Sequence, residues 1–288
     1  MSGGPQIALL PDGRRLHLHH GPIDLIAEAF GERIEIESAY SQAARRFDGL
    51  LQELVDELEL LRTPINELGT EPDGPVARIM TTAVRSHTGV FVTSMAAVAG
   101  AVADTVLAAM VEGHDLPRAY VNNGGDIALH LADGESFTAG LVFEMDAPAI
   151  DGMATISGSA PVRGIATSGW QGRSLSLGIA DSVTVLARTA TQADVAATLI
   201  ANAVNVDHPA VRRAPAEIIE LDSDLGDRLV TVDVGELDDS AIAIALHRGE
   251  AAASTMWSKG LIDSAALTLQ GQTRTIGIDA FLDHQKVA

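Results

Sequence analysis

The stretch Tyr120-Val-Asn-Asn-Gly-Gly-Asp-Ile-Ala-Leu-His130 decides how this chain is expected to fold. An apolar run that ends at Val121 gives way to Asn122-Asn123-Gly124-Gly125-Asp126, and a second apolar run follows over 127–131. This pattern predicts two strands joined by a tight Gly-Gly crossing. Paired glycines either adopt positive φ or let backbone N–H groups approach a ligand, and both uses stay open. Asp126 adds a carboxylate at the exit of the crossing.

The composition is that of a globular protein with an aliphatic core. The chain has 288 residues, of which 47% are hydrophobic and only 3% aromatic. Its length is enough for one large domain or two small ones. The core must therefore be built mainly from Ala, Val, Leu and Ile.

The charge of the chain limits its partners. A net charge of −20 and a pI near 4.6 argue against binding to nucleic acid or to anionic membrane surfaces. A small anionic ligand remains compatible, because local donors and a metal ion can hold it. The chain has no cysteine, which excludes disulfides, thiol catalysis and Cys-ligated metal centres. The first twelve residues do not resemble a signal peptide, so we expect a cytoplasmic protein.

The N-terminal part reads as short strands followed by a long helix. Strands are expected over 7–10 and 15–19, joined by an Asp12-Gly13 hairpin turn, and then over either 23–27 or 34–36. Ser38 is expected to begin a helix that runs to residue 61 and stops before Pro64. Three histidines, His17, His19 and His20, resemble metal ligands, but an exposed strand edge is the favoured interpretation.

A central helix is expected before the deciding stretch. Residues 75–87 read as a short helix or strand, and a second helix over 95–112, closed by Gly113, is apolar on nearly every face. The apolar run 90–111 contains polar and small residues, so a buried helix fits better than a membrane span. Asp104 is the only charge inside this helix, and a buried carboxylate there needs a partner, either backbone amides or a ligand.

The remaining elements complete a mixed architecture. Strands are expected over 137–143, 152–157, 162–166, 182–186, 218–221, 229–234 and 266–278, with helices over 191–205 and from Asp239-Ser240 onward. Because helices and strands do not alternate with a regular βαβ beat, the predicted class is α+β. We expect a single domain over 1–288, with N-terminal strands and helix over 1–75, a pocket-forming core over 76–210 and a C-terminal closure over 211–288.

Two residues of the helix expected from Thr191 are candidates for a metal site. Asp194 and Thr198 are four residues apart and therefore lie on one helical face near the N-terminus. A carboxylate and a hydroxyl are hard-oxygen ligands suited to Mg²⁺, and a helix N-terminus favours phosphate. The alternative is structural, since Thr191-Gln-Ala-Asp194 also matches a helix capping box.

Other polar residues carry weaker signals. Thr167-Ser168-Gly169 alone is typical of a turn. His208 is either a base or an ordinary loop residue. The sequence contains no Gly-x-Ser-x-Gly elbow, Walker A motif or Rossmann fingerprint.

Taken together, these motifs resemble the ApbE superfamily, whose best-known members are FAD:protein FMN transferases. The matching segments, in order over residues 90–205, are Val98-Ala-Gly100-Ala-Val-Ala-Asp104, Asn123-Gly-Gly-Asp-Ile127, Gly164-Ile-Ala-Thr-Ser-Gly169, Ser182-Val-Thr-Val185 and Ala193-Asp194 followed by Thr198. More narrowly, Phe91-Val-Thr-Ser-Met-Ala-Ala-Val-Ala-Gly100, Leu177-Gly-Ile-Ala-Asp181 and Val206-Asp-His-Pro209 resemble the UPF0280 branch.

The resemblance implies an ApbE-like two-lobed fold with a flavin-nucleotide pocket that binds FAD or FMN. It implies that Asp194 and Thr198 are Mg²⁺ ligands, helped by a backbone carbonyl near Val98. The residues that would line the ligand pocket are Asp104, Asn123, Gly124, Gly125, Asp126, Thr167, Ser168 and Gly169. Asp126 or Asp181 would act in catalysis by orienting a nucleophile.

Three departures from the family pattern bear on the reaction. Ala99 stands where the family has Lys, and Ala101 stands where it has Tyr. The interval 170–181 lacks the His-containing segment of the transferases. These losses argue against transfer of FMN to a protein Thr.

Two classes of function follow from the sequence. The first is a Mg²⁺-dependent transferase or hydrolase acting on a flavin-like or related dinucleotide. The alternative is a non-catalytic flavin- or pterin-binding accessory protein, because the UPF0280 branch is associated with one-carbon metabolism linked to tetrahydromethanopterin or with sulfur metabolism. Exposed strand edges and the Ala-rich composition are compatible with a homodimer.

Overall fold

The structure is a computed structural model that describes residues 4–87, 89–141 and 152–277. It divides into two compact units. The first contains Met1–Phe137, Ser157–Ala166 and Ala187–Asp194, and the second contains Thr138–Ile156, Thr167–Leu186 and Val195–Ala288. The arrangement of helices with antiparallel strands confirms the predicted α+β class. The assignment of the whole chain to one domain stays a prediction.

The first unit is built on an antiparallel sheet. Its strands lie in the order β1 (Gln6–Leu9), β2 (Leu16–His20), β3 (Ile23–Phe30), β4 (Arg118–Asn123), β5 (Asp126–Leu131) and β8 (Gly164–Ser168), of which the first three residues of β8 belong to this unit. The predicted hairpin at Asp12-Gly13 joins β1 to β2, with Gly13 at φ 68°.

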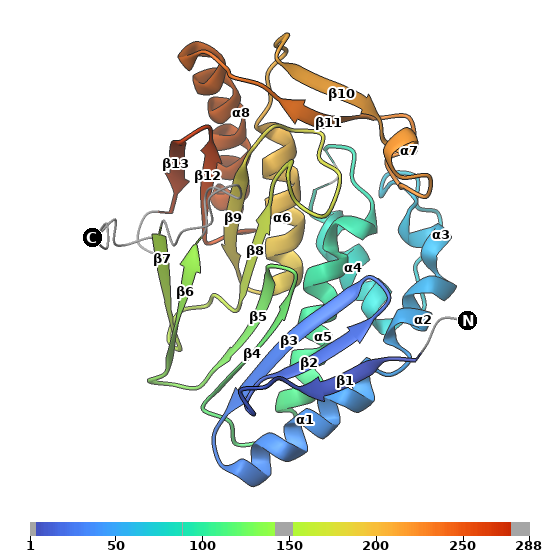
Figure 1. Cartoon of the computed structure of the whole chain (residues 1–288), viewed down its shortest axis with the longest axis vertical. Coiled ribbons are helices and arrows are strands. Elements are labelled where there is room, and N and C mark those ends of the chain that lie inside the picture. Colours follow the sequence, from blue (N-terminus) through green and yellow to red (C-terminus); the bar gives the residue numbers. More distant parts are fainter. Residues whose placement is uncertain (1–3, 88, 142–151, 278–288) are drawn as a thin grey trace. The chain divides into compact units, whose positions relative to one another are not determined.

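One face of this sheet carries small side chains that let a helix approach closely. The fully buried row Ala27, Val121 and Ala128 runs across β3, β4 and β5. Helix α5 (Val98–Val111), labelled in Figure 1, packs against β4 and β5. The prediction of a buried central helix closed by Gly113, which has φ 74°, is confirmed. The alanine-rich composition is thus explained by close packing of helix on sheet.

The other helices of the first unit differ in part from the prediction. They are α1 (Arg33–Phe47), α2 (Leu50–Asp56), α3 (Leu58–Leu61), α4 (Pro75–Arg85) and the 3₁₀ helix η1 (Ser94–Ala97). The expected single helix from Ser38 to residue 61 is wrong, because Gly49 at φ 80° breaks it and its start lies at Arg33. The alternative strand over 34–36 is also wrong, since those residues lie in α1.

The second unit contains three sets of antiparallel strands. The paired elements are β9 (Ser182–Ala187) with β12 (Ser264–Leu269) and β13 (Gln272–Ile276), β6 (Ser136–Leu141) with β7 (Gly152–Ser157), and β10 (Val211–Pro215) with β11 (Leu229–Val234). Helix α8 (Asp239–Ser258) packs against β12 and β13, and Asp238 caps it by accepting from the Ser240 and Ala241 N–H groups.

Two strand predictions in the second unit need correction. Residues 218–221 do not form a strand, because helix α7 (Ala216–Ile219) and a turn occupy them. The expected closing strand over 266–278 is two strands separated by a turn at Gln270-Gly271. The ends of the predicted strands 137–143 and 266–278 lie partly outside the described residues.

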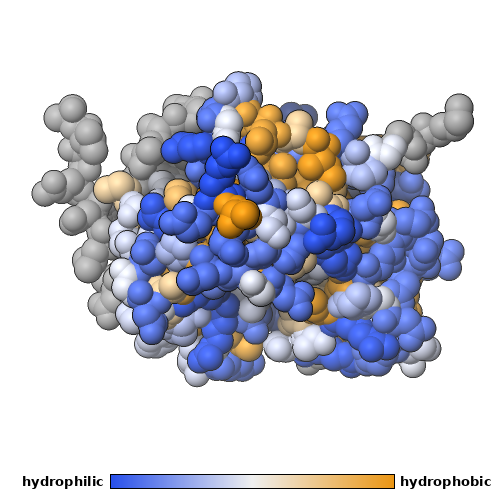
Figure 2. All heavy atoms as spheres, turned by 90° about the horizontal axis from the view of Figure 1, so that it is seen from below, coloured by the Kyte–Doolittle hydropathy of each residue, from blue (hydrophilic) through white to orange (hydrophobic). Residues whose placement is uncertain are grey.

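Polar side chains dominate the face of the molecule drawn in Figure 2, where hydrophobic residues form separate groups. This distribution agrees with the net charge of −20. By length and composition, one described segment, Ser94–Val111, is apolar enough to cross a membrane. Half of that segment is buried inside the fold, as in a core helix.

Candidate functional site

The deciding stretch forms the predicted hairpin, β4 followed by β5. Asn123 pairs with Asp126, and the two residues between them, Gly124 and Gly125, have φ of 64° and 113°. Such positive φ values suit a tight two-residue hairpin turn. A Cβ on Gly125 would meet nothing within 4 Å, so backbone conformation rather than close packing requires glycine there. The Asn122 Oδ1 atom accepts a hydrogen bond of 2.9 Å from Gly125 N, which fixes the turn.

The Asn123 side chain joins this turn to the start of α5. It is almost fully buried, and its Nδ2 atom donates a hydrogen bond of 3.1 Å to the Ala99 carbonyl. The N–H of the same peptide group, Gly100 N, donates a hydrogen bond of 2.9 Å to Asp194 Oδ2. Asn123 and Asp194 are therefore held by adjacent residues of one helical turn.

Helices α5 and α6 (Ala190–Ala203) cap each other at their N-termini. Asp194, in the first turns of α6, accepts from Gly100 N in the first turn of α5. In return, Asp104 of α5 accepts from Ala190 N at 3.1 Å, and from Thr191 N and Thr191 Oγ1 at 2.8 and 2.6 Å. Each carboxylate satisfies amide groups that have no partner within their own helix. The partner that the buried Asp104 needs is thus the backbone of a second helix.

The contact between the two helices depends on the absence of a side chain at Gly100. A Cβ placed there would lie 2.3 Å from the Ala190 carbonyl oxygen, which is far inside van der Waals contact. Gly164 of β8 is similarly constrained, since its Cβ would lie 2.1 Å from the Thr189 carbonyl oxygen. Glycine at both positions lets the start of α6 sit directly against the neighbouring backbone.

The predicted start of α6 needs correction. The helix begins at Ala190, and Thr189 Oγ1 accepts from Gln192 N at 3.1 Å, so the local cap is Thr189-Ala-Thr-Gln192. Thr191 does not act as the cap, because its N–H and hydroxyl both bind Asp104. The capping-box interpretation of Asp194 is therefore wrong, and its carboxylate serves a different helix.

The electrostatics of the pair favour a proton or a cation. Burial is the largest cause that raises the pKa of Asp194 to about 7, the Gly100 and Ala99 N–H groups oppose the shift, and the charge of Asp104 adds to it. Burial also raises the pKa of Asp104, against the lowering effect of its hydrogen bonds to Thr191 and Ala190. Part of the Asp194 side chain still reaches solvent, so an ion can approach it. Two carboxylates in one poorly solvated place cannot both be charged without a cost.

Thr198 follows Asp194 by four residues on α6 and is half-buried. Oxygen donors of this kind, a carboxylate and a hydroxyl, fit Mg²⁺, which keeps several waters and takes few protein ligands. The described residues hold no group of three or more His, Cys, Asp or Glu side chains placed for a metal ion. The assignment of Asp194 and Thr198 as metal ligands stays a prediction.

The other predicted pocket residues lie in the second unit, and their hydrogen bonds there are internal. Thr167 Oγ1 and Thr184 Oγ1 are 2.9 Å apart, which ties β8 to β9. Gly169 is required by close packing, since its Cβ would lie 2.2 Å from the Asp181 carbonyl oxygen. Ser168 is half-buried at the end of β8. The predicted ligand contacts of these three residues stay predictions.

Asp181, a predicted catalytic residue, anchors two loops of the second unit. Its Oδ1 atom accepts from Trp170 Nε1 at 3.2 Å, and its Oδ2 atom accepts from Gln270 N at 2.5 Å. Because each Asp181 carboxylate oxygen accepts a hydrogen bond from an N–H group, the geometry favours a role in positioning the loops that carry Trp170 and Gln270. Asp126, the other predicted catalytic residue, begins β5 directly after the glycine turn.

Sequence reasoning missed Gln270. This residue has φ 44°, a backbone conformation that non-glycine residues adopt at a cost. Its side chain accepts from Leu237 N and donates to the Gly235 carbonyl, at 3.0 and 2.8 Å. A Gln-Gly pair between two apolar runs was the available signal for this hairpin turn.

Within the described residues, the histidine candidates belong to no group of three or more His, Cys, Asp or Glu side chains placed for a metal ion. His17 Nε2 lies 2.6 Å from Asp24 Oδ1 in an exposed pair. The strand-edge interpretation is wrong, because β2 pairs with β1 on one side and with β3 on the other. His208 Nδ1 accepts from Ala210 N at 3.2 Å in a loop, which matches its ordinary structural interpretation.

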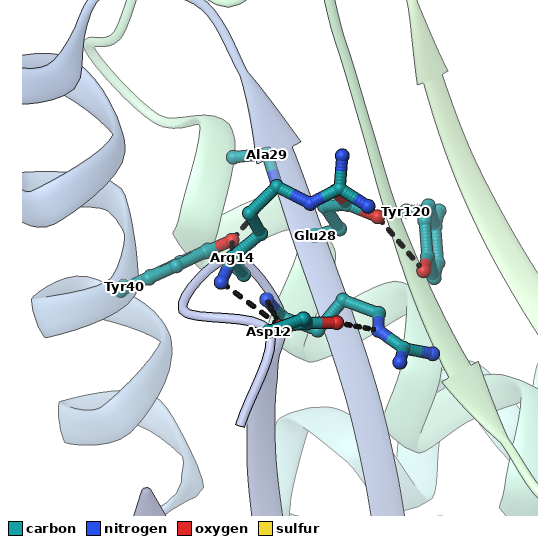
Figure 3. Close-up of polar contacts among 7 residues, drawn as sticks. Asp12, Arg14, Glu28, Ala29, Tyr40 and Tyr120 are labelled. Atoms are coloured by element: carbon teal, nitrogen blue, oxygen red, sulfur yellow. Dashed lines mark hydrogen bonds and ion pairs between the residues drawn. The ribbon is translucent and has the colours of Figure 1, made fainter. Parts of the chain in front are cut away.

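A second polar cluster surrounds Glu28 on β3 (Figure 3). Tyr120 donates a hydrogen bond of 3.2 Å to the nearly buried Glu28, and Arg14 lies 3.7 Å from the same carboxylate. Burial, together with the Glu28 charge, raises the pKa of Tyr120 to about 12, so its hydroxyl remains a donor. Tyr40 of α1 bridges the Arg14 carbonyl and Ala29 N. This cluster links the β1–β2 turn, β3, β4 and α1.

Comparison with known proteins places this architecture in a family. The observed class is an α+β protein in which a glycine turn and two helix-capping carboxylates meet in one unit. The chain belongs to the family described as AbpE bacteria, whose model matches residues 7–275.

Three curated UPF0280 proteins are similar to parts of the chain. UPF0280 protein MK0206 of Methanopyrus kandleri is 39% identical over 157 residues, which is 53% of this chain and 59% of that protein. The proteins of Methanothrix thermoacetophila and Methanothermobacter thermautotrophicus are 38% and 37% identical, covering 39% and 46% of this chain and 46% and 50% of their own lengths. The chain thus spans about half the length of the curated relatives that it matches. These similarities and the family model support the UPF0280 prediction.

Proposed function

We propose that this protein is a Mg²⁺-dependent transferase or hydrolase that acts on a flavin-like or related dinucleotide in the cytoplasm. The observation that carries the proposal is the meeting of Asp194 and the glycine turn through adjacent residues, Gly100 and Ala99. A carboxylate with a raised pKa beside a turn whose Gly124 is exposed suits a metal-phosphate complex. The resemblance to the ApbE superfamily supplies the flavin-like ligand, FAD or FMN.

Asp194 and Thr198 would hold the metal ion, with water completing its shell. A bound Mg²⁺ ion would supply charge stabilisation at a phosphate oxygen. The chain's own residues do the rest: Asn123, Gly124 and Gly125 orient the phosphate groups, and Asp104 keeps the first turn of α6 in place.

Asp126 and Asp181, two carboxylates outside the metal site, have different roles. Asp126 follows the glycine turn directly and would accept a proton from the attacking nucleophile. Asp181 would act by keeping the Trp170 loop in position. Thr167, Ser168 and Gly169 would line the ligand pocket, as the resemblance implies.

The second candidate is a non-catalytic flavin- or pterin-binding accessory protein in one-carbon metabolism linked to tetrahydromethanopterin, or in sulfur metabolism. Its specific support is the loss of family groups: Ala99 replaces Lys, Ala101 replaces Tyr, and residues 170–181 contain no His. Under either candidate the partner is a small molecule rather than nucleic acid or a membrane, and a homodimer is compatible with the strand edges.

Calorimetry and product analysis separate the candidates. The purified protein is titrated with FAD, FMN and a pterin, with and without Mg²⁺, and the FAD mixture is analysed for AMP and FMN. An enzyme releases AMP or FMN in a Mg²⁺-dependent way that disappears in Asp194→Ala. Binding without turnover supports the accessory role, whereas binding of none of these ligands contradicts both candidates. Exposed Asp115→Asn is the matched control and should behave as wild type.

A further inference from the structure

The connection between β10 and β11 presents large apolar side chains to solvent. Ile218 and Ile219 in α7 are 71% and 51% exposed, Leu221 is 92% exposed, and Leu229 at the start of β11 is 56% exposed. Leu221 is the most exposed large hydrophobic residue among those that the structure describes. We call these four side chains the 218–229 surface.

The backbone of the 218–229 surface is held by hydrogen bonds. Ala216 N donates to the Arg228 carbonyl and Glu217 N to the Gly226 carbonyl, both at 2.9 Å. Leu229 pairs with Pro215, the residue directly before α7, which brings Leu229 to the base of that helix. The hairpin itself is anchored by Thr231, whose hydroxyl donates to the buried Gly178 carbonyl at 2.7 Å. The apolar side chains are therefore held outward by a hydrogen-bonded frame.

Because these apolar side chains are exposed, they contribute little hydrophobic stabilisation to the folded chain. Burial of such side chains against a partner removes apolar surface from water, which favours association. Contiguous exposed apolar residues with a polar rim are typical of protein-interaction surfaces. The 218–229 surface combines exposed apolar side chains with acidic neighbours in the sequence, which are the components of such a site.

The charge around the surface selects the kind of partner. Residues 217–228 contain the acids Glu217, Glu220, Asp222, Asp224 and Asp227 and a single base, Arg228. Nucleic acid and anionic lipid are repelled by this rim. A second copy of the chain is also disfavoured, because a two-fold contact would place the same carboxylates against each other.

We propose that the 218–229 surface docks a second protein that presents an apolar pocket bordered by Lys and Arg side chains. The apolar side chains supply the buried contact, and the acidic rim supplies orientation and a salt-dependent association rate. This interaction is independent of the ligand chemistry proposed above.

Full-length Leu221→Ser and Ile218→Ser, with Ile244→Ser as the matched control, provide the first test. Ile244 is 47% exposed on α8 in the same unit. All three variants should keep the wild-type Tm, because the substituted side chains have few internal contacts. A clear fall in Tm for Leu221→Ser would show that Leu221 packs inside the folded chain, which overturns the proposal. Light scattering over a concentration series must show no self-association that depends on Leu221, since that result would assign the surface to a second copy.

The second test identifies and measures the partner. A photoreactive residue is placed at 221 or at 244 in the organism's own cells, and a protein cross-linked only from position 221 is purified. We expect Leu221→Ser to weaken its binding by at least about tenfold, Ile244→Ser to leave binding unchanged, and Glu220→Gln/Asp222→Asn to weaken it most at low salt. The proposal fails if no protein is cross-linked from 221, if Leu221→Ser binds as well as Ile244→Ser, or if salt strengthens binding.

Discussion

Asp194 shows how one residue acquires its properties from distant neighbours. Its carboxylate lies in α6, yet the amide that it binds belongs to Gly100, 94 positions earlier in the chain. Burial and the nearby Asp104 make its charged form unfavourable. The same features that raise its pKa make it a good place for a cation, because a bound cation removes the repulsion.

Stability against pH tests this environment. The pKa of Asp194 rises from 3.8 to about 7 on folding, so the folded protein holds a proton that the unfolded chain has lost. This contribution to the free energy of unfolding is therefore complete below about pH 4, falls as pH rises through 7 and is gone above it. In metal-free buffer we expect wild type to lose stability between pH 5 and 8 relative to Asp194→Asn, measured by urea denaturation. Parallel curves for the two proteins would contradict the assigned pKa, and Asp115→Asn serves as the exposed control.

At the scale of elements, the reciprocal capping of α5 and α6 is the main finding. Loss of a helix cap costs about 0.5–2 kcal/mol, and leaving buried donors unsatisfied costs about 1–3 kcal/mol. Asp104 accepts three hydrogen bonds at the start of α6. Its removal should therefore weaken the junction between the two helices.

Asp104→Ala and Asp104→Asn separate hydrogen bonding from charge. We expect Asp104→Ala to lower the free energy of unfolding by about 2 kcal/mol, because the Ala190 and Thr191 N–H groups lose their acceptor. Asp104→Asn should lose less, since its carbonyl oxygen still accepts and no charge is buried. Urea unfolding of both variants measures the difference. Equal losses, or no loss for Asp104→Ala, would show that this cap does not hold the helices together.

The sequence predicts elements whose causes are local. The hairpin around Gly124-Gly125 follows from two apolar runs and a glycine pair, and the structure confirms it. The start of α6 was misplaced because the Thr191 hydroxyl binds Asp104, 87 residues away. The sequence predicts a single long helix from Ser38 because the apolar stripe continues on both sides of Gly49, where the structure has a break.

The candidate site was predictable in its residue types but not in its connections. Polarity and family resemblance single out Asp104, Asn123 and Asp194. In the structure, Asn123 and Asp194 bind the first turn of α5, and Asp104 binds the first turn of α6. The acceptor role of Asp104 toward α6 depends on tertiary packing, which no local pattern reveals. The anchoring of Gln270 to Asp181 was missed for the same reason.

At the scale of the whole molecule, the proposed function requires an acidic chain with a net charge of −20 to bind an anionic dinucleotide through local features. We propose that the glycine turn and a cation at Asp194 bind the phosphate groups. The family model matches residues 7–275, so the glycine turn and Asp194 both lie within the matched segment. A bound divalent cation would locally reverse the repulsion between the protein and phosphate groups.

The most direct measurement of the central claim uses Mn²⁺ as a paramagnetic substitute for Mg²⁺ in amide-resolved NMR. The account predicts that Mn²⁺ broadens the Gly100, Gly124 and Gly125 amide signals in wild type, and that Asp194→Asn removes this broadening while Asp115→Asn keeps it. Unchanged glycine signals in wild type, or equal broadening in Asp194→Asn, would contradict a metal site at Asp194 beside the glycine turn.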